Sequence, residues 1–244
     1  MPLQVPTLRF SDAFSLDFRV SELGEARIRE LQEGPICGAK LYADGYAVLH
    51  GSCVNATGKT VAFVGPSVAG KSTLAACFCL RGAQLVSDGM TAVHPETLKV
   101  VPGLARTKLN GDSLRLLGVA PNDYALVHPE SEKRYFPVSG VDCALESDTG
   151  LVKHLSYPLS AIFIIEDGQE LEMTPIEGAQ SLVKLMANSY LAHYLHASQS
   201  SILMQRVASL IQNGVQVRTL RRLREPSCLL ETVEAIEREV SKIR

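Results

Sequence analysis

Hydrophobic residues along the chain fall into short runs whose spacing changes from strand-like to helix-like. Within residues 7–64, apolar or alternating runs are bounded by turn residues, as strands usually are. These runs predict strands at 8–10, 14–20, 39–54 and 60–65. A short helix fits the spacing of residues 22–32. We therefore expect a β-rich N-terminal segment over residues 1–49.

A strand–loop–helix–strand pattern follows. Apolar residues 61–64 predict a strand, and a glycine-rich loop comes directly after it. Residues 72–82 predict a helix that ends at Gly82, and residues 83–93 predict a second strand. A β–loop–α–β unit is the context in which a glycine motif binds phosphate.

The second half of the chain begins with a weak pattern over residues 96–155, which can include a mobile substrate loop. Residues 159–173 predict two strands around Asp167-Gly168, a dipeptide typical of hairpin turns. Further elements are expected as helices at 176–196 and 199–212, a strand at 215–222 and an amphipathic helix at 227–244. The apolar face of that last helix is expected to contain Leu229, Leu230, Val233, Ile236 and Val240.

No linker separates two parts of this pattern, so we expect one α/β domain over residues 1–244, with its core from 50 to 244. Hydrophobic residues make up 46% of the chain, which is enough for a sizeable core. The net charge of −2 gives no general reason to expect nucleic acid or an anionic membrane as a partner.

The basic residues near the last strand also give no reason to expect nucleic acid as a partner. A basic cluster has no aromatic residues between its members and is more typical of ion pairs with acids of the last helix. The cluster consists of Arg218, Arg221, Arg222 and Arg224. The six cysteines form no C-x-x-C pair, which favours reduced thiols over zinc or disulfides. The chain shows no signal-like start and no run long enough to span a bilayer, so we expect a cytoplasmic protein.

The stretch FVGPSVAGKST, residues 63–73, has the spacing Gly65-x-x-x-x-Gly70-Lys71-Ser72. Glycines let backbone N–H groups converge on a phosphate chain, and the following helix adds the positive end of its dipole. Lys71 can reach the β- and γ-phosphates, and Ser72 can ligate Mg²⁺. We expect ATP with Mg²⁺ to contact Gly65, Pro66, Ser67, Val68, Ala69, Gly70, Lys71, Ser72 and Thr73. The alternative is a glycine turn that caps a helix and binds nothing.

Phosphoryl transfer also needs an acid near the terminal phosphate, and two aspartates are candidates. Asp88 ends the strand that follows the loop helix, and we favour it as this acid, which can also ligate Mg²⁺. It can instead cap a turn. Asp167, together with Glu166, ends an apolar run as in many P-loop ATPases, but the hairpin interpretation is favoured there.

Residues 50–93 resemble the catalytic domain of HPr kinase/phosphorylase. The shared features are a His-Gly pair, a strand pair, the phosphate loop, a helix ending in Arg-Gly and a strand ending in Asp. Later segments resemble the shorter stand-alone relatives of that kinase, which include lasso-peptide precursor kinases. The resemblance implies a P-loop mixed sheet of the HPr kinase C-terminal and PEP carboxykinase-like type.

The same resemblance implies an ATP-dependent kinase that phosphorylates a hydroxyl, in the family a protein serine. It places His50 at the active site, makes Asp88 the base, and assigns phosphate and Mg²⁺ to Lys71 and Ser72. The implied partner is a peptide or protein, such as a precursor peptide or an HPr-like protein, and a small-molecule acceptor stays open. We also expect a homo-oligomer.

The chain departs from the family pattern at two places. Gly89 follows Asp88 where the family has a second acid, and the region RTKLNGDSLRLLG lacks a recognisable Glu-x-x-Gly. The reverse phosphorylase reaction and the HPr substrate therefore stay open. The alternative function is a nucleotide-binding regulatory module with little or no transfer activity. Four basic residues between these motifs can bind phosphate or an acidic peptide, or simply be solvated: Arg106, Lys108, Lys133 and Arg134.

Overall fold

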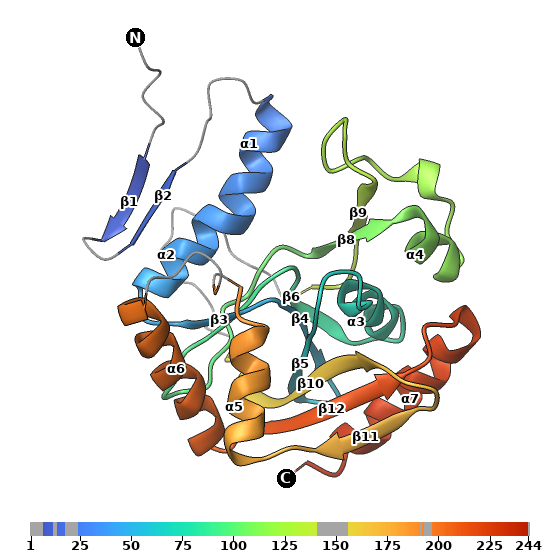
Figure 1. Cartoon of the computed structure of the whole chain (residues 1–244). Coiled ribbons are helices and arrows are strands. Elements are labelled where there is room, and N and C mark those ends of the chain that lie inside the picture. Colours follow the sequence, from blue (N-terminus) through green and yellow to red (C-terminus); the bar gives the residue numbers. More distant parts are fainter. Residues whose placement is uncertain are drawn as a thin grey trace.

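The computed structural model describes residues 7–11, 14–17, 24–140, 156–190, 192 and 197–243. Its centre is a six-stranded mixed sheet in the order β11-β12-β10-β5-β4-β6 (Figure 1). The strands are β4 (Gly51–Ala56), β5 (Lys59–Val64), β6 (Gln84–Ser87), β10 (Leu159–Asp167), β11 (Glu172–Pro175) and β12 (Gln216–Arg222). Strands β5, β10 and β12 are parallel, whereas β4 is antiparallel to both β5 and β6. Strand β6 therefore runs in the same direction as β5.

Helices cover both faces of this sheet, giving three layers. Alternate residues of β5 face opposite layers, as strand geometry requires. Val61 and Phe63 pack with α3 and α7, and Ala62 and Val64 pack with α2, α5 and α6. These helices are α2 (Cys37–Ala43), α3 (Lys71–Leu80), α5 (Gly178–Ala187), α6 (Ala197–Gln212) and α7 (Leu229–Val240).

Smaller elements surround the sheet. The two-stranded sheets are β1–β2, β3–β7 and β8–β9, and the β8–β9 pair packs with α4 against α3. Their bounds are β1 (Thr7–Ser11), β2 (Phe14–Asp17), β3 (Ala47–Leu49), β7 (Thr91–Val93), β8 (Arg106–Asn110), β9 (Lys133–Pro137) and α4 (Gly111–Leu116). Helical segments complete the fold as α1 (Glu25–Leu31), a π-helical segment (Gln32–Ile36) and 3-10 turns at Pro121–Asp123 and Pro226–Cys228.

Several sequence predictions are confirmed. The mixed α/β class is observed, and the strand–loop–helix unit appears as β5 and α3. Gly82 lies beyond the end of α3 with φ +99°, and the next N–H donates to the carbonyl of Phe78 at 3.0 Å. The terminal helix is confirmed as α7, although Leu230 lies outside its buried face with 51% exposure.

The short helix expected within residues 22–32 is confirmed as α1, but the β-rich N-terminal prediction is wrong for the rest of residues 25–43, which are also helical. The expected strand at 39–54 is replaced by α2, β3 and the start of β4. Ala39 and Tyr42 are both buried, and their spacing of three fits one face of a helix. Gly45, with φ +99°, follows the end of this helix, and its N–H donates to the carbonyl of Tyr42 at 3.1 Å.

Two strand predictions also differ from the structure. The strand expected at 83–93 breaks after Ser87, so that β6 joins the main sheet and β7 pairs with β3. The hairpin at Asp167-Gly168 is wrong, because β10 has parallel neighbours on both sides and β11 pairs with β12.

Parts of other predictions cannot be compared with the structure. The helix expected at 176–196 is observed over Gly178–Ala187, and residues 191 and 193–196 lie outside the described residues. Residues 141–155 of the weakly patterned region also lie outside the described residues, and Cys143 is one of them. Within the part of the chain that is described, no helix has the length and apolar character needed to cross a membrane.

Candidate functional site

The candidate site lies at one edge of the main sheet. Strands β5, β6, β10 and β12 run in the same direction, so their carboxyl ends meet at this edge, where ligands of α/β sheets usually bind. The loop at 65–70 follows β5, and Asp88 follows β6. His50 comes directly before β4, the strand that lies between β5 and β6 in the sheet. Because Gly51 of β4 pairs with Val64 of β5, His50 lies at the same edge, between the loop and Asp88.

The loop at 65–70 has a tightly constrained backbone. A Cβ at Gly65 would lie 3.1 Å from the carbonyl oxygen of Ile165. Gly70 has φ +91°, and a Cβ there would lie 2.4 Å from Nη2 of Arg222. Val68 also has a positive φ, +59°, which is unfavourable for a β-branched residue. This loop opens directly into α3, whose N-terminus attracts anions.

Lys71 is a buried cation at the end of this loop, with 7% exposure. Its Nζ donates to the carbonyl oxygens of Gly65 and Pro66, both at 2.8 Å. It forms no ion pair with a carboxylate of the described residues. Burial lowers the pKa of Lys71 to about 8, and the charge of Lys133 acts in the same direction, whereas Asp88 raises it. An anionic ligand would supply the missing counter-charge.

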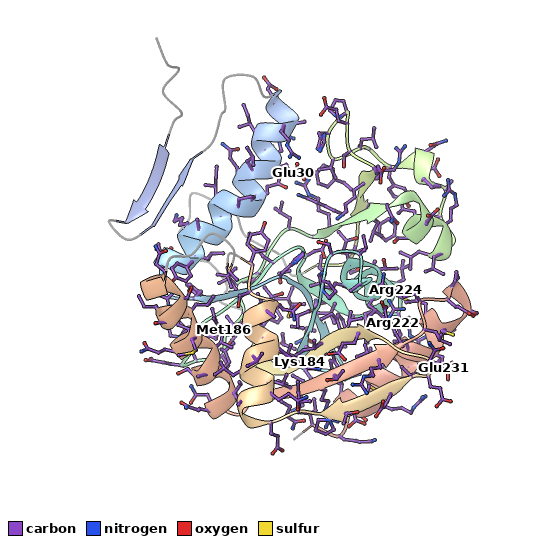
Figure 2. The ribbon with its side chains drawn as sticks, viewed as in Figure 1. Glu30, Lys184, Met186, Arg222, Arg224 and Glu231 are labelled. Atoms are coloured by element: carbon purple, nitrogen blue, oxygen red, sulfur yellow. The ribbon has the colours of Figure 1, made fainter. Side chains whose placement is uncertain are left out.

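Arg222 is a second buried cation beside the same loop (Figure 2). Its Nη2 donates to the carbonyl of Ala69 at 3.1 Å and its Nη1 to that of Leu223 at 3.3 Å. Nε is buried and has no hydrogen-bond partner among the described residues. Burial lowers the pKa of Arg222, and the neighbouring charge of Arg224 lowers it further. The end of β12 thus supplies the loop with a guanidinium group that forms no ion pair within the described residues.

The rest of the basic cluster has a different role. Arg218 pairs with Glu239 of the terminal helix at 2.6 Å, as expected for this cluster. Arg221 instead contacts Glu166 at the end of β10, and Arg224 pairs with Asp167. The two carboxylates at the end of β10 are therefore engaged by cations, which distinguishes them from Asp88.

Asp88 is held by groups from other elements. Its Oδ1 accepts from Oγ of Ser52 at 2.6 Å, and its Oδ2 accepts from the backbone N–H of Lys108 at 3.1 Å. A carboxylate has about four acceptor positions, so two remain for a metal ion or a hydroxyl. Both donors are distant in sequence, so these contacts differ from those of an aspartate that caps its own turn.

His50 is uncharged at neutral pH. Burial and the charges of Lys71 and Lys133 lower the pKa of His50 to about 4, against the opposing effect of Asp88. Its ring stacks edge-to-face with Tyr190 at a centroid distance of 6.0 Å. His50 can therefore act at the site as a neutral hydrogen-bonding group and not as a phosphate-binding cation.

Sequence reasoning singled out the loop, His50 and Asp88, and the structure brings them to one edge. It did not assign Arg222 to the loop or distinguish Lys133 from its basic neighbours. Lys133 of β9 lies near enough to lower the pKa values of both Lys71 and His50. No local signal marks these two residues, because Arg222 reaches the site through the pairing of β12 with β10, and Lys133 through the packing of the β8–β9 pair against α3.

The described residues contain no group of three or more histidines, cysteines or acids that could hold a metal ion. A magnesium ion needs less from the protein, because it is usually bound by one or two carboxylates plus substrate phosphates and water. Of the two residues expected to ligate magnesium, Asp88 supplies such a carboxylate, and Ser72 lies in the first turn of α3, directly after the loop. The described cysteines are free thiols: Cys37, Cys53, Cys77, Cys79 and Cys228.

Gly70→Ala is expected to lower the free energy of unfolding by about 2 kcal/mol or more, through left-handed strain and the contact with Arg222. Gly58→Ala is the matched control, because Gly58 also has a positive φ, +80°, but open space around its Cβ position. Urea denaturation measures both variants. In an Arg222→Ala background the cost at Gly70 should fall toward the control value. An equal cost in both backgrounds would contradict the close contact.

Comparison with solved structures pairs the chain with the HPr(Ser) kinase/phosphatase from Coxiella burnetii. The two share 13% identity with a TM-score of 0.39, over 80% of this chain and 97% of that chain. No protein-family model matches the chain, and no curated protein gives a significant match. The functional proposal therefore rests on the geometry of the site.

Proposed function

We propose that the protein is an ATP-dependent kinase that transfers the γ-phosphoryl group to a hydroxyl, with a serine of a peptide or protein as the first candidate acceptor. The observation that carries this proposal is a pair of buried cations, Lys71 and Arg222, at a constrained glycine loop that opens into a helix. Neither forms an ion pair within the described residues, and the carboxylate of Asp88 lies close enough to affect the pKa of Lys71.

Each group has a role that its contacts allow. The N–H groups of residues 67–73 and the ammonium of Lys71 would bind phosphate oxygens, with Nζ exchanging its two loop carbonyls for the ligand. Ser72 and Asp88 would hold Mg²⁺, which neutralises phosphate charge when bound. His50 would orient the acceptor or a phosphate oxygen as a neutral group.

The proposed transfer is an in-line displacement. The acceptor oxygen bonds to the γ-phosphorus while the bond to the ADP leaving group breaks, and the hydroxyl proton passes to the carboxylate of Asp88. The hydrogen bonds from Ser52 and Lys108 would hold that carboxylate in position.

A second candidate function is a nucleotide-binding regulatory module without efficient transfer. The feature that favours it is Gly89, which has φ +80° and leaves Asp88 as a lone acid at its turn. Both functions share the nucleotide site and differ in the phosphoryl acceptor.

The test combines purified protein, Mg²⁺, ATP and a mixture of serine peptides and simple hydroxyl compounds. A kinase adds one phosphoryl group to an acceptor, detected by mass spectrometry, and releases equal ADP. Nucleotide binding without transfer to any acceptor would favour the regulatory module. Failure to bind ATP would contradict both functions.

A further inference from the structure

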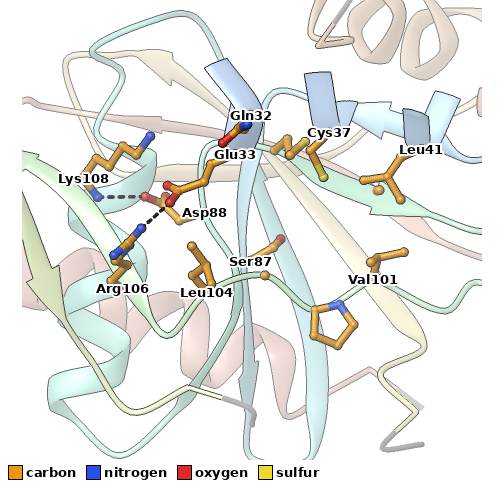
Figure 3. Close-up of a pocket in the computed structure, with 14 residues that line it drawn as sticks. Gln32, Glu33, Cys37, Leu41, Ser87, Asp88, Val101, Leu104, Arg106 and Lys108 are labelled. Atoms are coloured by element: carbon orange, nitrogen blue, oxygen red, sulfur yellow. Dashed lines mark hydrogen bonds and ion pairs between the residues drawn. The ribbon is translucent and has the colours of Figure 1, made fainter. Parts of the chain in front are cut away.

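A cavity of about 370 Å³ is lined in part by Asp88 and by no residue of the glycine loop (Figure 3). The π-helical segment and α2 form one wall, the end of β6 and the start of β7 form the base, and residues 101–108 form the opposite wall. Its volume is within the range of small-molecule sites, about 300–1,000 Å³. The proposed phosphoryl site and this cavity therefore share the carboxylate of Asp88.

The polarity of the cavity changes from one end to the other. In Figure 3, Glu33, Asp88, Arg106 and Lys108 gather at one end, whereas the other end is bounded by apolar side chains that include Leu41. The apolar part of the lining consists of Cys37, Leu41, Met90, Ala92, Val101, Pro102 and Leu104. A molecule that fits this gradient has a polar group near Asp88 and an apolar body.

The charges at the polar end largely cancel. Arg106 and Glu33 form an ion pair at 2.6 Å across the two walls. The remaining opposite charges are those of Asp88 and Lys108, and the backbone N–H of Lys108 already donates to Asp88. Two positive and two negative side chains leave no net charge to attract an ionic acceptor.

Resting on the proposed kinase function, we propose that the acceptor carries its hydroxyl next to an uncharged apolar group, and that this group fills the cavity. The hydroxyl donates to an acceptor position of Asp88 that Ser52 and Lys108 do not use. The apolar group is transferred from water into the apolar end of the cavity. Two sources share this chemistry: a small alcohol with an apolar body, and a serine whose neighbouring side chain is apolar.

The experiment measures kcat/KM for transfer in two series of acceptors. One series is the straight-chain primary alcohols from ethanol to hexan-1-ol. The other is Gly-Ser-X peptides in which X is Gly, Leu, Phe or Glu. Burial of each methylene is worth about 0.8 kcal/mol, so kcat/KM should rise about fourfold per methylene until the cavity is filled.

Val101→Trp fills the cavity and should abolish the preference for apolar acceptors. Val183→Trp on the exposed face of α5 is the matched control, because that valine is 67% exposed and lies outside the cavity. Val101→Ser keeps the cavity open with less apolar surface and should reduce the gain for hexan-1-ol several-fold. It serves as the test variant where the tryptophan variant fails to fold.

Cys37 lines the cavity and gives a measure of occupancy that needs no transfer. Alkylation of its thiol, followed by peptide mapping, should slow as alcohol length increases in the wild type and not in Val101→Trp. The series that shows the gain in kcat/KM, alcohol or peptide, identifies the source of the acceptor.

The outcomes separate the two proposals. Equal transfer to Gly-Ser-Gly, Gly-Ser-Leu and all alcohols, with Val101→Trp unaffected, would overturn the acceptor proposal and leave the kinase function standing. Length-dependent protection of Cys37 with no transfer to any acceptor would support apolar occupancy and overturn the kinase function. No transfer to any acceptor, together with no protection of Cys37 by any alcohol, would overturn both the acceptor proposal and the kinase function.

Discussion

Replacing Lys71 with alanine is expected to weaken ATP binding by about 10- to 100-fold, the value of one hydrogen bond from a charged donor. The free energy lost from ATP binding should exceed the free energy lost from folding. Lys71 is a buried cation without a carboxylate partner in the described structure, so its removal breaks no ion pair there. Lys71→Met keeps the volume without the charge and should unfold at the same or higher urea concentration than the wild type. Isothermal titration calorimetry measures the affinity.

The control for this variant is Lys59→Ala, at the start of strand β5, which precedes the loop. It should bind ATP as the wild type does. Unchanged nucleotide affinity in Lys71→Ala would remove this lysine, and with it the loop, from the proposed site.

Lys71 should also make nucleotide affinity depend on pH. Its pKa of about 8 in the free protein must rise when phosphate binds, so binding takes up a proton above pH 8. Affinity should fall by up to tenfold per pH unit above that value, and Lys71→Arg should show a flat profile.

The folding stability of the free protein should change with pH in the opposite direction. Between pH 8 and 10.5 the unfolded chain binds more protons at Lys71 than the folded chain does, so the contribution of Lys71 to stability rises with pH.

Asp88→Asn is expected to reduce phosphoryl transfer by about 10²- to 10⁴-fold, the usual contribution of a general base. ATP binding should largely persist, because the loop and Lys71 are unchanged. Without Mg²⁺ the affinity should stay equal or increase, since the substitution removes a negative charge near the phosphates. Rapid-quench measurement of ADP and phosphorylated product separates the two steps.

Asp112→Asn is the matched control, because Asp112 is an exposed aspartate of α4 that pairs only with Arg115 among the described ion pairs. It should transfer at the wild-type rate. Transfer at that rate by Asp88→Asn would exclude Asp88 as the base and would direct attention to another acceptor of the proton.

Local sequence patterns were sufficient for the elements that carry the loop. The run before Gly65, the helix after it and the stop at Gly82 depend on neighbours within a few residues, and all three are observed. The terminal helix was predicted for the same reason. Leu230 was misplaced because apolar spacing gives only an approximate face, and the packing of α7 on the sheet decides which side chains are buried.

Strand partners were decided by the tertiary structure. Asp167-Gly168 has the sequence of a hairpin turn, but β10 is buried between parallel β5 and β12, so the chain crosses to the edge of the sheet before β11 forms. The break after Ser87 has a similar origin, because β6 and β7 pair in different sheets. Neither choice is encoded within a single segment.

The sequence by itself determined a glycine loop between a strand and a helix, with Asp88 one β–α–β step away. Only the tertiary structure placed Arg222 beneath that loop, Lys133 near Lys71 and an apolar cavity beside Asp88. The physical reason is the distance along the sequence between the residues that interact. Backbone conformation and helix ends follow from nearby residues, whereas a counter-charge or a cavity wall comes from segments that meet only when the sheet and its covering layers assemble.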